Sequence, residues 1–208
     1  MYRARILAAA AVLPSLLLAA LGPTASAAPA ARPNPGVPHC IAADGTDINA
    51  LFHVNVRIIG PLACREAYAN ERWVRVVPSW TTAADAQSAV YPEGYKPSRP
   101  NPIDDFNSKF LSATYITDIG TAQEQRVTFK KNEVLRTGFV GTDGLPFTGI
   151  ISPPLKGLPV GPHTSAVLVT LKAQHCDGLG TVVEENCLPA GTTEYSGPAP
   201  FTVVPRPA

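Results

Sequence analysis

Apolar and polar residues alternate along several short stretches of this chain. Residues 52–58, for example, place phenylalanine, valine or isoleucine at every second position, with polar residues between them. An alternation of period two is typical of a β-strand with one buried face. Similar patterns predict about seven strands, at residues 52–58, 72–77, 113–117, 126–130, 147–151, 167–174 and 201–203.

Short strands separated by turn residues favour an all-β fold. Antiparallel sheets bury their apolar faces by packing in two layers, so we predict an immunoglobulin-like antiparallel β-sandwich. A long insert, from Trp80 to Phe106, separates the second and third strands. We expect it to carry short helical turns, because Asn101 and Pro102 suit the start of a helix and Thr82 and Asp85 have capping-box spacing.

The first 27 residues have the layout of a secretory signal peptide. Arg3 and Arg5 precede an apolar stretch at residues 6–21, and small residues at 25–27 supply the cleavage pattern. The apolar stretch is shorter than the roughly 20 residues that a membrane span needs. We therefore expect a secreted, extracellular protein that begins at Ala28 or one residue later and has no membrane span after cleavage.

The rest of the chain is expected to form a leader and one domain. Residues 28–38 are rich in alanine and proline and have no periodic apolar pattern, which favours a flexible leader. Residues 39–208 show no internal repeat and no long linker. We predict that they form a single β-sandwich domain, because all-β domains of this length are commonly single units.

Charged residues are few and nearly balanced. The 208 residues include 17 Lys and Arg against 16 Asp and Glu, and charged residues make up 16% of the chain, compared with roughly 25% in ordinary soluble domains. Nucleic-acid binding requires a clustered excess of basic residues, and binding to anionic lipid requires a basic block. Neither partner is expected, and a hydrophobic content of 45% argues against a disordered chain.

Four cysteines follow the signal peptide. An even number of cysteines in an exported chain favours disulfide bonds. We favour Cys176–Cys187, which would close a glycine-containing loop, and Cys40–Cys64, which would link the segments before and after the first predicted strand. The crossed pairings stay open because spacing alone does not fix connectivity.

Metal binding is a less favoured use of these residues. His39 and His175 each precede a cysteine, and thiolate with imidazole suits zinc or copper. Neighbouring residues of a strand point to opposite faces, however, and no Cys-x-x-Cys accompanies them. The acidic loop 177–185 has apolar residues where calcium ligands would lie, so we expect a solvated hairpin tip. We predict no metal site and no cofactor.

No motif in the chain carries catalysis. The sequence lacks Gly-x-Ser-x-Gly, His-Glu-x-x-His and a phosphate-binding glycine-rich loop. Asp104 and Asp105 could be compared with the paired carboxylates of a glycosidase. In the first turn of a short helix, they are expected to complement the helix dipole. His163 is expected to support its turn, so we predict no catalytic residue and a protein that is not an enzyme.

Several stretches resemble parts of known proteins. Leu-Pro-Val-Gly-Pro-His-Thr at 158–164 is similar to the late corner of bacterial immunoglobulin-like and fibronectin-type modules. Together with residues 97–106, 173–180 and 185–191, it resembles a group of uncharacterised secreted actinobacterial proteins. The likeness covers most of the mature chain. It implies an extracellular protein with an immunoglobulin-like β-sandwich, and it implies no activity and no functional residues.

These observations favour a secreted or cell-envelope-associated binding or structural module for a protein or cell-wall ligand. An inhibitor of an extracellular enzyme is the alternative, because a preorganised loop loses little entropy on binding. A hydrolase with a dispersed site is a third hypothesis. For a binding module we predict contacts at Trp80, Tyr91, Tyr95 and Arg99 of the long insert. In a competing interpretation, the aromatic residues of the insert fold back as a lid over one end of the sandwich.

Overall fold

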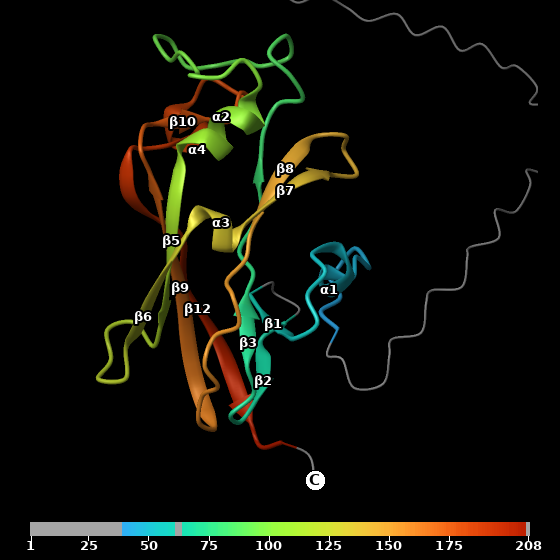
Figure 1. Ribbon diagram of the computed structural model, residues 1–208, viewed down its shortest axis with the longest axis vertical. Coiled ribbons are helices and arrows are strands. Elements are labelled where there is room, and N and C mark those ends of the chain that lie inside the picture. The colour runs from blue at the N-terminus through green and yellow to red at the C-terminus, as the bar shows by residue number, and fades with distance from the viewer. Residues whose placement is uncertain (1–38, 61–63, 207–208) are drawn as a thin grey trace, which may run out of the picture. The chain divides into compact units, whose positions relative to one another are not determined.

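A computed structural model of the protein describes residues 39–60 and 64–206 (Figure 1). The predicted signal peptide and leader lie outside the described residues. Strands account for most of the regular structure in the described part, and the helices are short, which confirms the all-β class. None of the described helices has the length and apolar character needed to cross a membrane.

The elements are short apart from two long strands. The helices are α1 (Ile48–Leu51), α2 (Pro102–Lys109), α3 (Lys131–Val134) and α4 (Val183–Asn186). The strands are β1 (Arg57–Ile59), β2 (Glu66–Tyr68), β3 (Trp73–Arg75), β4 (Trp80–Thr81), β5 (Phe110–Thr117), β6 (Gln125–Lys130), β7 (Leu135–Val140), β8 (Pro146–Ile150), β9 (Gly161–Leu171), β10 (His175–Cys176), β11 (Cys187–Leu188) and β12 (Gly191–Val204).

The largest sheet has five strands in the order β2-β12-β9-β5-β6. Its neighbours are antiparallel except for β2, which runs parallel to β12. Figure 1 shows β5, β9 and β12 as long, curved strands lying side by side. The alternation predicted for 113–117, 126–130, 167–174 and 201–203 coincides with strands of this sheet, although β9 ends at Leu171.

Three smaller sheets hold the other described strands. β1 pairs with β3 in parallel, β4-β8-β7 is antiparallel, and β10 pairs with β11. The immunoglobulin-like arrangement is therefore not confirmed, because the strands are distributed over several sheets and two of these contain parallel pairs. The predicted strands at 72–77 and 147–151 are confirmed in outline by β3 and β8.

β3 separates two hydrophobic clusters. Trp73 and Val77 pack on the main core with Phe106, Tyr115 and other residues of the five-stranded sheet. Val74 and Val76 face a second cluster that contains Cys40, Phe52 and Ile151. The alternation of β3 thus places its successive side chains in different cores, as its sequence predicts.

The strand predicted at 52–58 is wrong over most of its length. Asp47 accepts a hydrogen bond from the backbone amide of Ala50 and caps α1, which ends at Leu51. Phe52 is the C-cap of this helix, and His53 has a positive φ of 53°. Only the last residues of the stretch are extended, as part of β1.

The long insert contains a helix at one of the two places where helical turns are expected. Asn101 accepts a hydrogen bond from the amide of Ile103 at 3.1 Å and caps α2, which confirms that prediction. At the other place where a helical turn is expected, after Thr82, the chain forms a hydrogen-bonded turn and no helix. Asp85 accepts hydrogen bonds from Gln87 and Ser88 in a local turn, which competes with helix formation.

Both favoured disulfides are present. Cys40 bonds to Cys64 with 5.7 Å between their Cα atoms, and Cys176 bonds to Cys187 with 4.0 Å. The second disulfide joins the paired residues of β10 and β11. Two disulfide bonds fit an oxidising, extracellular compartment.

Gly60 leaves space for a buried arginine. Nη1 of Arg75 donates to the carbonyl oxygen of Val76 at 2.8 Å and to that of Ile59 at 3.5 Å. A Cβ atom on Gly60 would overlap both the Val76 carbonyl and Nη1 of Arg75. Glycine is therefore required here for a close approach to a charged side chain.

We expect Gly60→Ala to reduce the free energy of unfolding by about 3 kcal/mol, because the added methyl group displaces Arg75 or the Val76 backbone. Gly144→Ala is a matched control, since Gly144 also has positive φ, at 80°, but nothing lies within 4 Å of an added Cβ. Gly144→Ala should reduce the free energy of unfolding by about 1 kcal/mol, because of backbone strain. Urea unfolding measures both values, and equal losses would show that the overlap at Gly60 is unimportant.

Candidate functional site

Asp105 lies at the junction of the insert, α2 and β10. Asn101 caps α2 and Pro102 occupies its first turn, which sets the orientation of the two aspartates that follow. Asp104 is exposed, whereas Asp105 is 0% exposed. The two acidic residues predicted to complement the helix dipole therefore have different environments.

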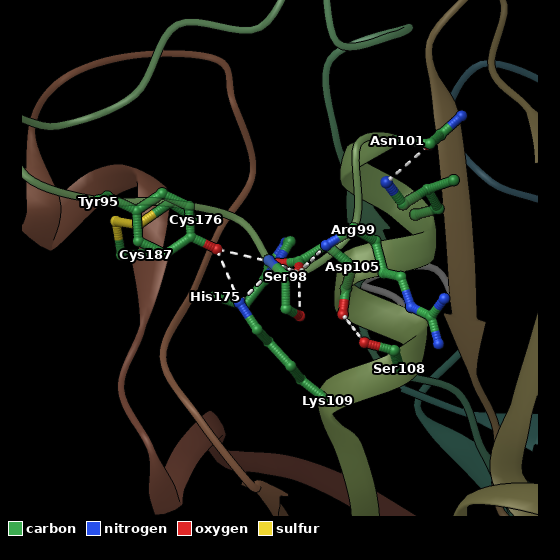
Figure 2. A network of polar contacts seen from close by, with 11 residues as sticks. Tyr95, Ser98, Arg99, Asn101, Asp105, Ser108, Lys109, His175, Cys176 and Cys187 are labelled. Carbon is green, nitrogen blue, oxygen red and sulfur yellow. Dashed lines mark hydrogen bonds and ion pairs between the residues drawn. A yellow bond between two sulfur atoms is a disulfide. The ribbon is translucent and has the colours of Figure 1, made fainter.

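The carboxylate of Asp105 accepts six hydrogen bonds (Figure 2). Oδ1 accepts from the backbone amide and hydroxyl of Ser98, both at 2.7 Å, and from the amide of Arg99 at 3.1 Å. Oδ2 accepts from the Tyr95 hydroxyl at 2.9 Å, Nζ of Lys109 at 2.7 Å and Nδ1 of His175 at 2.8 Å. We call this set of residues the Asp105 network.

The network keeps Asp105 ionised although it is buried. Burial by itself raises the pKa of Asp105, but hydrogen bonds from His175, Lys109, Ser98 and Tyr95 outweigh it and hold the pKa well below its ordinary value. Lys109 supplies the compensating charge from one turn along α2, and its Nζ also donates to the Tyr95 hydroxyl at 3.0 Å. A buried ion pair of this kind is stable only with such additional hydrogen bonds.

His175 is held as a neutral imidazole. Burial lowers its pKa, and the attraction of Asp105 offsets this only in part. The neutral ring donates from Nδ1 to Asp105, which leaves a lone pair on Nε2. Nε2 is buried and has no hydrogen-bond partner among the described residues.

An Asp–His pair orients the base in catalytic triads, but this pair is enclosed. His175 is fully buried, and its ring centroid lies 5.7 Å from that of Trp80 and 5.3 Å from that of Phe106. None of the described hydroxyl groups donates to Nε2. The geometry therefore joins the insert to β10 and does not present a base to a substrate.

The residues predicted to bind a partner are divided between the interior and the surface. Trp80 stacks on Phe106 at 5.5 Å, and Tyr95 is held in the Asp105 network. Tyr91 packs against Tyr95 at 5.2 Å, and its hydroxyl is buried. Arg99 is exposed and bonds to Asp105 only through its backbone. The inward packing of Tyr91, Tyr95 and Phe106 agrees with the lid interpretation. Partner binding by Trp80, Tyr91, Tyr95 and Arg99 stays a prediction.

The insert is bonded to the loop closed by the Cys176–Cys187 disulfide. The Val90 amide donates to the carbonyl of Gly178 at 2.8 Å, and the Ala83 amide donates to that of Asp177 at 2.9 Å. A Cβ on Gly178 would lie 2.9 Å from Cβ of Ala89, so glycine permits this close packing. These hydrogen bonds and this close packing connect the insert directly to the disulfide loop.

Four exposed aliphatic side chains lie on the insert and the disulfide loop. Val90 and Leu179 form a β-bridge and are 53% and 47% exposed, and Val182 and Val183 are 46% and 43% exposed. We call these four residues the aliphatic patch. Sequence reasoning treated the apolar residues of 177–185 only as an argument against calcium, although the same residues indicate an apolar surface.

A groove lies beside the aliphatic patch. Its volume is about 570 Å³, and its lining includes Tyr95, Lys96, Lys109, Gln174 and Val183. The Asp105 network thus contributes part of the groove wall through Tyr95 and Lys109.

Comparison with known proteins assigns no family. No protein-family model, curated protein or solved structure matches the chain. Inferences about function therefore depend on the residues and geometry of this chain.

We expect Asp105→Asn to reduce the free energy of unfolding by about 3–5 kcal/mol, because it leaves the ammonium of Lys109 buried without a counter-charge. Asp104→Asn makes the same chemical change on the exposed neighbour and should alter stability by less than about 0.5 kcal/mol. Urea unfolding of both variants checks this. A similar small effect at both positions would contradict a central role for Asp105.

The network also predicts how stability depends on pH. The folded-state pKa of Asp105 lies below 3.8, so its contribution is complete above pH 3.8 and is lost as the pH falls below that value. The lowered pKa of His175 adds a loss that begins as the pH falls below 6.5. In urea titrations, the free energy of unfolding should fall in both windows. Below pH 3.8, the difference in free energy of unfolding between wild type and Asp105→Asn should shrink. A difference that stays constant with pH would disprove the lowered pKa of Asp105.

Proposed function

We propose that this protein is a secreted binding module that docks an extracellular protein through the aliphatic patch. The observation that carries the proposal is that Leu179, Val182 and Val183 of one short disulfide-closed loop, and Val90 bridged to Leu179, are each more than 40% exposed. Contiguous exposed apolar side chains on a soluble protein mark interaction sites. The predicted signal peptide and the two disulfides support an extracellular location.

Preorganisation supports the same function. The Cys176–Cys187 disulfide closes the loop that carries three patch residues, and the β-bridge from Val90 to Leu179 joins it to the insert. The Asp105 network holds the insert in place through the Tyr95 hydroxyl and the backbone amide of Ser98. A surface ordered before binding loses little conformational entropy when a partner docks.

The chemistry of the patch favours a protein partner. Its centre consists of aliphatic side chains, and Glu184 and Glu185 are exposed beside it. An apolar centre with a charged rim is the usual anatomy of a protein interface. The complementary surface is expected to have an apolar centre and basic residues at its rim.

Enzyme inhibition is the second candidate function, and the disulfide-closed loop favours it. A loop held at its base by Cys176 and Cys187 can enter the cleft of an extracellular enzyme at low entropic cost. In that case the captured partner is an enzyme and loses activity when the protein binds. A non-inhibitory module leaves the activity of its partner unchanged.

The test uses the immobilised, disulfide-bonded protein to capture partners from the surface and culture medium of the producing organism. The double variant Leu179→Ser/Val183→Ser should weaken capture at least about tenfold, as removal of a central apolar contact does. Val140→Ser/Val160→Ser is the matched control, because these valines are 66% and 55% exposed on other elements. Equal capture by both variants, at unchanged melting temperatures, would refute the proposal.

A further inference from the structure

Arg75 is a buried charge that pairs with no acidic side chain among residues 39–60 and 64–206. Its side chain is 2% exposed and lies on the same face of β3 as Trp73 and Val77, which pack in the main core. Its described hydrogen-bond partners are the carbonyls of Ile59 and Val76 and the hydroxyl of Ser196, at 3.1 Å from Nη2. These acceptors carry no formal charge, and Nε of Arg75 has no partner among the described residues.

Two further buried polar atoms lie on the sheet that faces Arg75. The register of the five-stranded sheet aligns Ser196, Val167 and Tyr115 across β12, β9 and β5. Ser165 is two residues from Val167 on β9, so both side chains point to the same face. The hydroxyl groups of Tyr115 and Ser165 are buried and have no partner in the described part of the protein.

The charge environment is positive. Burial lowers the pKa of Arg75 to about 10, which still leaves the guanidinium protonated at neutral pH. Burial raises the pKa of Tyr115, and the positive charges of Arg75 and Arg136 oppose this rise. The Tyr115 hydroxyl therefore lies within the electrostatic field of both cations. An uncompensated charge in a protein interior is strongly unfavourable, and buried polar groups are normally hydrogen-bonded.

We propose that a halide ion, chloride in the extracellular medium, binds inside the core between β3 and the five-stranded sheet. The ion accepts hydrogen bonds from Nε of Arg75 and from the hydroxyl groups of Tyr115 and Ser165, and it compensates the guanidinium charge. All three groups can donate, which suits an acceptor without protons. A halide also needs less space than an oxyanion in a close-packed interior.

A groove of about 220 Å³ is lined by residues that include Trp73, Tyr115 and Leu155, so it leads to one of the proposed ligands. The ion site is separate from the aliphatic patch and does not depend on the proposed docking function. Its role is to hold β3 against the five-stranded sheet.

Bromide provides the direct test because it replaces chloride and scatters anomalously. Crystals of the disulfide-bonded protein soaked in sodium bromide should show an anomalous peak beside Nε of Arg75 and the Tyr115 hydroxyl. Ordinary water density there, without an anomalous peak, would overturn the proposal.

Thermal unfolding provides the second test. At matched ionic strength, the melting temperature should rise saturably with chloride or bromide and should not rise with gluconate. Tyr115→Phe and Ser165→Ala each remove one hydroxyl. Each should raise the halide concentration that gives half-maximal stabilisation by about tenfold or more, the effect of losing a hydrogen bond to a charged group.

Thr114→Val is the matched control, because it removes a hydroxyl that bonds to Thr128 on the exposed face of the same sheet. This variant should keep the halide dependence of the wild type. A wild-type melting temperature that responds equally to gluconate and chloride would overturn the proposal. So would unchanged halide dependence in both Tyr115→Phe and Ser165→Ala.

Discussion

The organisation of one end of this protein depends on a single buried carboxylate. Asp105 accepts hydrogen bonds from the preceding part of the insert and from its own helix, and also from β10, which is 70 residues away in the sequence. Because an ionised carboxylate is unfavourable in the interior unless its lone pairs are satisfied, the insert must fold back onto α2. His175 then brings in β10, and Cys176 next to it closes the loop that bears most of the aliphatic patch (Figure 2).

Two buried charges are accommodated in different ways. Asp105 is neutralised by Lys109 one helical turn away, and its other hydrogen bonds come from nearby groups of the chain. The acceptors of the Arg75 side chain in the described part of the protein are all neutral, and Gly60 is needed to let the Val76 carbonyl approach it. The first arrangement is complete within the protein and acts as an anchor. The second leaves donors without acceptors, which is the basis for proposing an internal ion.

Local patterns predicted the elements that local forces determine. The alternation at 126–130 and 167–174 identified β6 and β9, and Asn101 with Pro102 identified the start of α2. β7 was missed because Gly138 has a φ of 88° at a register shift, and such a bulge breaks the period of two. The stretch 52–56 was misread because its alternation begins at Phe52, the C-cap of α1, and His53 then has a positive φ.

The sequence by itself determined the all-β class, the two faces of β3 and the start of α2, since each depends on residue spacing along the chain. The disulfide pairing was favoured by the sequence but was decided only by the structure, because spacing does not fix connectivity. Only the tertiary structure decided how the strands divide among the sheets and which polar groups meet. The burial of Asp105 and the exposure of Asp104 depend on which face of α2 packs against β10. Lys109 is one helical turn from Asp105, whereas His175 reaches Asp105 from 70 residues away through packing of β10 on α2, and no local pattern records that contact.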